Sequence, residues 1–116
     1  MYVNNSTISA FRLGRQFKRF SLSKKYFPLG PGSIFTIRLN KGYNACISLV
    51  ENVKLFSHVA NIGDTRSLII HPASTTHSQL SDNEKIKSGA GPDVIRLSIG
   101  LEDVKDIISD LDKSLN

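Results

Sequence analysis

The sequence has a single cysteine, no tryptophan and no long hydrophobic run. A membrane-spanning helix needs about 20 consecutive apolar residues, and the absence of such a run predicts a protein with no membrane partner. Cys46 is the only cysteine, so the chain cannot form an internal disulfide, which needs two thiols. A lone cysteine fits a reducing compartment such as the cytoplasm. Cys46 stands among apolar neighbours, so we expect a packed thiol rather than a reactive one.

Acidic residues are missing from the first 25 positions, which hold six of the 15 arginines and lysines. The other nine basic residues face all ten acidic ones, so the rest of the chain is almost neutral. The net charge of +5 therefore belongs to the N-terminal segment and not to a cationic face of the domain. This distribution argues against a globular nucleic-acid binder, and we predict no nucleic-acid partner.

Residues 1–23 mix phenylalanines, serines and basic side chains. This composition is that of a disordered tail, of a mitochondrial presequence, or of a basic arm for RNA or anionic lipid. The residues alone do not separate the three readings. We predict a disordered segment, with mitochondrial targeting as the alternative to a cytoplasmic location.

Hydrophobic periodicity from residue 33 onward predicts one α/β domain of the two-layer α+β kind. The expected elements, in the order β-α-β-loop-β-α, are a strand at 34–39, a helix at 43–60, a strand at 67–70, a capping box at 81–84, a strand at 94–99 and a helix at 101–115. Three strands and two long helices pack most economically as one small sheet with both helices on one face. The other face must then meet water or another domain.

Arg96 lies in the middle of the strand at 94–99, where alternation sends Ile95 and Leu97 to one face. Arg96 and Ser98 then point to the opposite face. A guanidinium placed rigidly on a strand can bind a carboxylate through two parallel hydrogen bonds. The alternative is an exposed or salt-bridged arginine, and the pattern alone favours that alternative.

The stretch HPASTTH puts His71 and His77 around three hydroxyl side chains. No third metal ligand stands at a recognisable spacing, so we expect no metal site. A serine or threonine nucleophile activated by His77 would lack an oxyanion motif and a third group, and no glycine motif for phosphate is present. We therefore predict no catalytic, cofactor-binding or metal-binding residue of this chain's own.

From about Lys24 to its end the sequence resembles the C-terminal part of the pyridoxal-phosphate enzymes of cysteine and methionine metabolism. Residues 1–23 do not resemble what precedes this part in the family, and we expect them to be non-homologous. The resemblance rests on the strings ANIGD, SLIIHPASTTH and RLSIGLED. Within that family it is most similar to the O-acetylhomoserine sulfhydrylases. It implies that residues 24–116 form the small C-terminal domain of an aspartate-aminotransferase-like, fold type I enzyme, packed against a large cofactor domain.

The resemblance also implies roles for individual residues. Arg96 would bind the α-carboxylate of the substrate, Asn61 would help to hold it, and HPASTTH would be a strand that runs into a loop near the active site. The complete enzyme would be a homotetramer that uses pyridoxal 5'-phosphate to convert O-acetyl-L-homoserine and sulfide into homocysteine and acetate, a step of methionine biosynthesis.

The family's cofactor lysine stands in a Ser-x-Thr-Lys-type motif that this sequence does not contain. We therefore expect the chain to be a fragment that is inactive alone, with the large domain missing or supplied by a separate chain. The alternative is a free-standing, non-catalytic interaction or regulatory module that is directed by its basic N-terminus. A lone amino-acid sensor is a third hypothesis.

Overall fold

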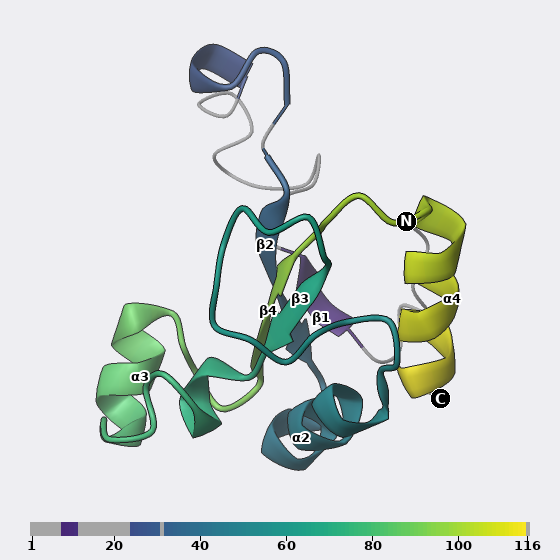
Figure 1. The fold of residues 1–116 in the computed structure, drawn as a ribbon. Helices are drawn as coiled ribbons and strands as arrows, with labels where there is room; N and C mark the ends of the chain where they lie inside the picture. The colour runs from purple at the N-terminus through teal and green to yellow at the C-terminus, as the bar shows by residue number, and fades with distance from the viewer. Residues whose placement is uncertain (1–7, 12–23, 31, 116) are drawn as a thin grey trace.

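The computed structural model describes residues 8–11, 24–30 and 32–115 (Figure 1). The described residues contain four strands, three α-helices of seven residues or more, a helical turn at residues 24–26 and the 3-10 turn η1 (Pro72–Ser74). The strands are β1 (Ile8–Phe11), β2 (Ile34–Leu39), β3 (Leu68–Ile70) and β4 (Val94–Ser98), and the helices are α2 (Gly42–Asn52), α3 (Asp82–Ser88) and α4 (Val104–Leu115). None of the described helices is long and apolar enough to span a membrane.

The four strands form one antiparallel sheet in the order β1-β2-β4-β3. Strand β4 is central, and its register places Arg96 between Thr36 of β2 and Ile70 of β3. The strand predicted at 94–99 is thus confirmed, and it is held by hydrogen bonds on both edges. A residue in the middle of such a strand has a closely defined position.

The two long helices cover one face of the sheet (Figure 1). The core contains Cys46 and Leu49 of α2 with Ile107 and Leu111 of α4. They pack on the side chains that the strands send to this face, which are Ile37, Leu39, Ile69, Ile95 and Leu97. The predicted two-layer α/β architecture is therefore confirmed.

The first long helix is shorter than predicted. It ends at Asn52, not at residue 60, and Val53 is already extended with ψ 142°. The backbone N–H groups of Lys54 and Leu55 donate to the carboxylate of Asp110 at 2.9 to 3.1 Å, so they are unavailable to the helix. The chain then pairs as a bridge at Ser57 with the start of β3, which helical periodicity does not reveal.

The N-terminal region also differs from the prediction. Ile8–Phe11 lies in the segment predicted to be disordered, yet it forms the edge strand β1 beside β2. The sheet therefore has one strand more than the predicted element order. The remainder of residues 1–23 lies outside the described residues, and so do the presequence and basic-arm hypotheses.

The capping box at the start of α3 is confirmed. The Glu84 carboxylate accepts hydrogen bonds from the Ser81 N–H at 2.9 Å and the Ser81 hydroxyl at 2.6 Å. These bonds hold the pKa of Glu84 below its usual value. Gly89 ends the helix in the left-handed conformation, with φ 80°, that glycine adopts at low cost.

A loop formed by residues 58–66, here called the Asn61 loop, crosses the face of the sheet opposite the two helices (Figure 1). Near its end it touches the chain that leaves β4. A Cβ on Gly100 would lie 2.3 Å from the carbonyl oxygen of Thr65 and 2.6 Å from the nitrogen of Ser67. Glycine is required here because two backbone segments pass in direct contact.

We expect Gly100→Ala to destabilise the fold by about 1 to 3 kcal/mol or more, since the obstructing atoms are backbone and cannot rotate away. Urea unfolding followed by circular dichroism measures the change. Gly91→Ala is the control, because there the nearest atom is a side-chain oxygen of Asp93 at 3.2 Å. Equal stability of the two variants would contradict the steric reading.

Candidate functional site

Arg96 is half-buried on the face opposite α2 and α4, as the alternation of β4 predicts. Its Nη2 donates to the backbone carbonyl of Asn61 at 3.2 Å. Within the described residues no carboxylate lies within salt-bridge distance of Arg96. The other arginine of this face near β4, Arg38, is by contrast bonded to Asp93 at 2.6 Å.

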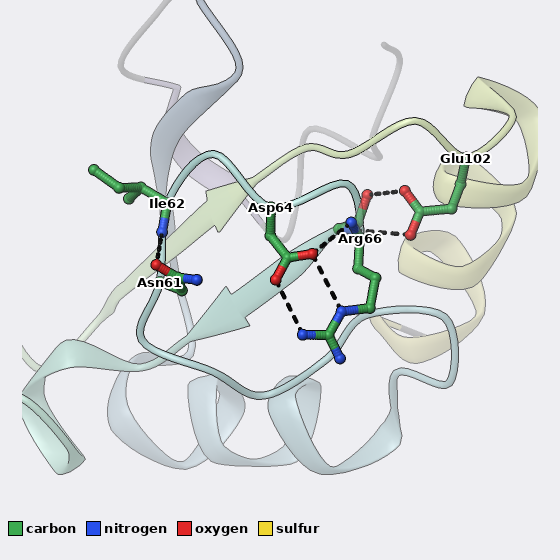
Figure 2. A network of polar contacts seen from close by, with 6 residues as sticks. Asn61, Ile62, Asp64, Arg66 and Glu102 are labelled. Atoms are coloured by element: carbon green, nitrogen blue, oxygen red, sulfur yellow. Dashed lines mark hydrogen bonds and ion pairs between the residues drawn. The ribbon is translucent and has the colours of Figure 1, made fainter.

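Asn61, the second predicted site residue, is brought to Arg96 by the Asn61 loop. Its contact with the guanidinium is made by the main chain, whereas the resemblance implies a role for the side chain. The side-chain Oδ1 accepts a hydrogen bond from the Ile62 N–H at 2.9 Å (Figure 2). With Oδ1 engaged, the Nδ2 donors are the main remaining hydrogen-bonding groups of this side chain.

The Asn61 loop is braced from within by an ion pair. Arg66 donates to Asp64 through Nε at 3.2 Å and Nη2 at 3.0 Å, and its backbone N–H also donates to Asp64 at 2.9 Å (Figure 2). These bonds lower the pKa of Asp64 to about 2. The carboxylate is thus ionised at neutral pH, and the fork of bonds joins residues 64 and 66 of the loop.

The base of the Asn61 loop is closed by main-chain bonds. The Ser57 N–H donates to the carbonyl of Ser67 at 2.9 Å, and the Ile69 N–H donates to the carbonyl of Ser57 at 3.0 Å. A surface loop whose two ends are joined in this way is an Ω-type loop, a form that is frequently functional. The residues between the closed ends therefore have a fixed entry and exit.

His71 has a structural environment. It is 1% exposed, its Nε2 lies 2.8 Å from the carbonyl of Pro92, and its Nδ1 lies 2.9 Å from the Ser74 hydroxyl. A carbonyl only accepts, so Nε2 bears the proton of the neutral ring. Burial lowers the pKa of His71, and the ring packs edge-on against Tyr43 with centroids 4.9 Å apart.

The rest of HPASTTH forms turns. Among the described residues no three histidine, cysteine or acidic side chains are grouped so that they could hold a metal ion. The His77 ring lies 2.8 Å from the Thr76 hydroxyl, and the His77 N–H donates to the carbonyl of Pro72 at 2.9 Å. The Thr75 hydroxyl donates to the carbonyl of His71 at 2.9 Å. These bonds are those of a capped turn, in which side-chain hydroxyls satisfy backbone carbonyls.

Cys46 is a packed thiol, as predicted. It is fully buried in the core, and burial, with a smaller contribution from the charge of Asp93, raises the pKa of its thiol to about 12. A thiol with such a pKa is almost never ionised and is a poor nucleophile.

The model of the family described as "Cys/Met metabolism PLP-dependent enzyme" matches residues 13–116. The chain belongs to this family. The match includes the Asn61 loop, Arg96 and both long helices. It starts upstream of Lys24 and so also includes residues 13–23, which we expected to be non-homologous.

Two relatives and two solved structures illustrate the similarity. An O-acetyl-L-homoserine sulfhydrylase from Thermus thermophilus is 50% identical over 93 residues, 80% of this chain and 22% of that protein. A homocysteine synthase from Schizosaccharomyces pombe is 40% identical over 94 residues, 81% of this chain and 22% of that protein.

A crystal structure from Campylobacter jejuni, assigned as an O-acetylhomoserine (thiol)-lyase and containing a pyridoxyl-lysine monophosphate, matches with TM-score 0.86 and 38% identity, covering 94% of this chain and 26% of that one. Cystathionine gamma synthase from Xanthomonas oryzae, solved with cystathionine, matches with TM-score 0.85 and 25% identity, covering 97% of this chain and 29% of that one. This chain therefore spans about a quarter of the length of the proteins it matches.

His71 should make the stability of the fold depend on pH. Its folded-state pKa lies below the ordinary 6.5, because burial, and to a lesser degree the charge of Lys85, disfavours the protonated ring. The unfolded chain therefore binds the proton more readily, so the stabilising contribution is complete above pH 6.5 and is lost as the pH falls through the folded-state pKa.

We expect the wild-type chain to lose more unfolding free energy between about pH 7.5 and 5.5 than the His71→Gln variant, measured by urea denaturation. His77→Gln is the matched control, and its pH dependence should follow that of the wild type. A His71→Gln variant with the wild-type slope would show that another group titrates.

Proposed function

We propose that this chain is the substrate-carboxylate-binding part of an O-acetylhomoserine sulfhydrylase. In this proposal Arg96 and Asn61 bind the α-carboxylate of O-acetyl-L-homoserine. The complete enzyme replaces the acetoxy group of that substrate with sulfide and releases homocysteine and acetate. The proposal rests on family membership together with the state of Arg96.

The observation that supports it most directly is a half-buried arginine that has no carboxylate partner among the described residues. An arginine that is partly withdrawn from water gains most from a bidentate anion. One N–H of the guanidinium is used by the carbonyl of Asn61, and the others are available to a ligand. The Nδ2 of Asn61 adds donors beside them, so every group offered here is one that a carboxylate accepts from.

The described residues do not fit the role of a cofactor-binding lysine. A lysine that binds pyridoxal phosphate covalently must lie in an enclosed site, where its amine can lose a proton. Seven of the eight described lysines are exposed at the surface, and the eighth, Lys85, lies 3.8 Å from Asp82. We propose that the cofactor and its lysine belong to a large domain, which in the relatives lies outside the matched quarter.

In this proposal the chain positions the substrate and does not bind the cofactor. Arg96 and Asn61 would fix the amino acid by its carboxylate, so that its reacting carbons lie at a constant distance from the cofactor. Positioning of this kind contributes through the entropy lost in advance of the reaction. Pyridoxal phosphate, when bound by the large domain, supplies the electron sink for the replacement at the γ-carbon.

A partner domain is also supported by exposed apolar side chains. Tyr26, Phe27 and Leu29 are 65%, 59% and 102% exposed, and Ile62, next to Asn61, is 59% exposed. Exposed apolar residues that stand close together, as at positions 26–29, mark interaction surfaces. We propose that the large domain covers these residues in a cytoplasmic homotetramer, either as part of the same protein or as a separate chain.

Arg96→Ala should weaken the binding of O-acetyl-L-homoserine by roughly tenfold or more, the loss expected when charge-assisted hydrogen bonds are removed. Titration of the ¹⁵N-labelled chain, followed by NMR at the backbone amide of residue 96 and at the signals of Asn61, measures this affinity in the wild type and in the variant. Arg38→Ala is the matched control, because Arg38 is already bonded to Asp93, and it should leave the affinity unchanged.

The absence of any response to O-acetyl-L-homoserine in the wild-type chain would contradict the proposal for the chain by itself. Binding that survives in Arg96→Ala would place the carboxylate elsewhere. Binding of free acetate with the same affinity would restrict the site to a general anion site.

Pyridoxal phosphate should not attach to one particular lysine of this chain. Because the described lysines lack an enclosed site, treatment with pyridoxal phosphate followed by borohydride should give only weak, scattered modification. Peptide mass spectrometry measures the distribution. Stoichiometric modification of one lysine would contradict the assignment of the cofactor to a separate domain.

A further inference from the structure

Ser67, at the entry to β3, is fully buried and yet uses each of its polar groups. Its N–H donates to Glu102 Oε1 at 2.7 Å and its hydroxyl donates to Glu102 Oε2 at 2.7 Å. The hydroxyl oxygen accepts from the Gly100 N–H at 3.0 Å, and the carbonyl accepts from the Ser57 N–H at 2.9 Å. We call this set of bonds the Ser67 junction.

The Ser67 junction joins three parts of the fold. Ser57 and Ser67 flank the two ends of the Asn61 loop, Gly100 follows β4, and Glu102 lies between β4 and α4. The Glu102 carboxylate and the end of the Asn61 loop lie side by side in Figure 2. A further bond, from the Leu101 N–H to the carbonyl of Thr65 at 2.8 Å, runs beside it.

Glu102 is the one member of the junction that binds through its side chain alone and has no place in the sheet. Both carboxylate oxygens accept short bonds from Ser67, and these bonds hold the pKa of Glu102 below its usual value. Removal of this carboxylate would leave a buried N–H and a buried O–H without their partner. Such groups cost enough free energy that the chain moves to satisfy them.

The movement would be transmitted to the candidate site by a short path. Ser67 ends the loop that presents the Asn61 carbonyl to Arg96, while Gly100 and Glu102 directly follow the strand that holds Arg96. The junction therefore fixes the loop with respect to β4 at a point close to both residues. The Asp64–Arg66 pair holds residues 64–66 together next to Ser67, so a shift at Ser67 enters the Asn61 loop at this point.

We propose that Glu102 is a positioning residue for the carboxylate site. By holding Ser67 against the end of β4, it keeps the Asn61 loop at the distance from which Asn61 and Arg96 bind one carboxylate together. This inference rests on the proposed function, in which these two residues bind the α-carboxylate of an amino-acid substrate. Glu102 itself does not touch the substrate.

The test compares the full chain with Glu102→Ala and Glu102→Gln. In Glu102→Ala the dissociation constant for O-acetyl-L-homoserine should rise roughly tenfold, because the loop loses its fixed position. Glu102→Gln should recover part of this loss, since its amide oxygen can accept from the Ser67 N–H, whereas its NH₂ cannot accept from the Ser67 hydroxyl. NMR titration of ¹⁵N-labelled protein measures the affinity, with Arg96 Nε–H exchange as a second readout that needs no ligand.

Ile107→Val is the matched control for stability. It removes one methyl group from the core under α4, so it weakens the fold without touching the Asn61 loop. Its affinity and its Arg96 exchange rate should equal those of the wild type. If Ile107→Val weakens binding as much as Glu102→Ala does, the effect of Glu102 is one of general stability and the proposal is wrong.

The outcomes separate the two proposals. If the wild type binds and Glu102→Ala binds equally well, the positioning role is wrong and the proposed function stands. If the wild type does not bind, the proposed function of the isolated chain fails, and the positioning role is then judged by Arg96 exchange, which should be faster in Glu102→Ala. Should Glu102→Ala fail to fold, Ser67→Ala, which keeps the backbone bond to Glu102, must shift both readouts in the same direction.

Discussion

The rest of the structure depends on the position of β4, which pairs with a strand on each edge and has one face in the core and the other face outside it. Its odd-numbered residues enter the core under α2 and α4, and Arg96 emerges between Thr36 and Ile70 on the opposite face. Every hydrogen bond that ties β4 to β2 and β3 also restricts the guanidinium. A charged side chain on a two-sided, centrally paired strand has little freedom other than its own rotamers, so its recognition properties derive directly from the sheet.

Two carboxylates from the C-terminal segment organise the connection between α2 and β3. Asp110 accepts hydrogen bonds from the N–H groups of Lys54 and Leu55 where the connection begins. Glu102 accepts hydrogen bonds from the N–H and the hydroxyl of Ser67 where it ends. At these points neither a helix nor a strand supplies a carbonyl for the backbone N–H groups, and each carboxylate takes the place of that acceptor. An irregular connection that crosses a sheet needs such acceptors, because unpaired N–H groups near the interior are costly. The C-terminal segment that completes the core with α4 thus also shapes the face that bears Arg96.

Local patterns in the sequence predicted most of the framework. Alternation identified β2 and β4, the serine and glutamate spacing identified the start of α3, and periodicity identified α4 to within three residues. The end of helix α2 was predicted eight residues too late, because the partner that ends it, Asp110, is more than 50 positions away and leaves no local trace. Strand β1 was missed since an edge strand lacks a strong pattern of its own.

For the candidate site, alternation placed Arg96 on the face opposite the helices, and only the family motifs pointed to Asn61. The serine at position 67 and Glu102 stand within those motifs, but their pairing depends on a crossing of two backbones that no spacing rule encodes.

The state of Cys46 has a practical consequence for spectroscopy. With its pKa near 12, roughly one thiol in 100,000 is ionised at neutral pH, and the side chain is fully buried as well. The natural sequence therefore already provides a background that is silent to maleimide and methanethiosulfonate reagents while the fold is intact. A single cysteine introduced at an exposed site would accept a fluorophore or spin label selectively, without removal of the native one. Exposure of Cys46 itself, on the other hand, would report unfolding of the core through the rate at which it reacts.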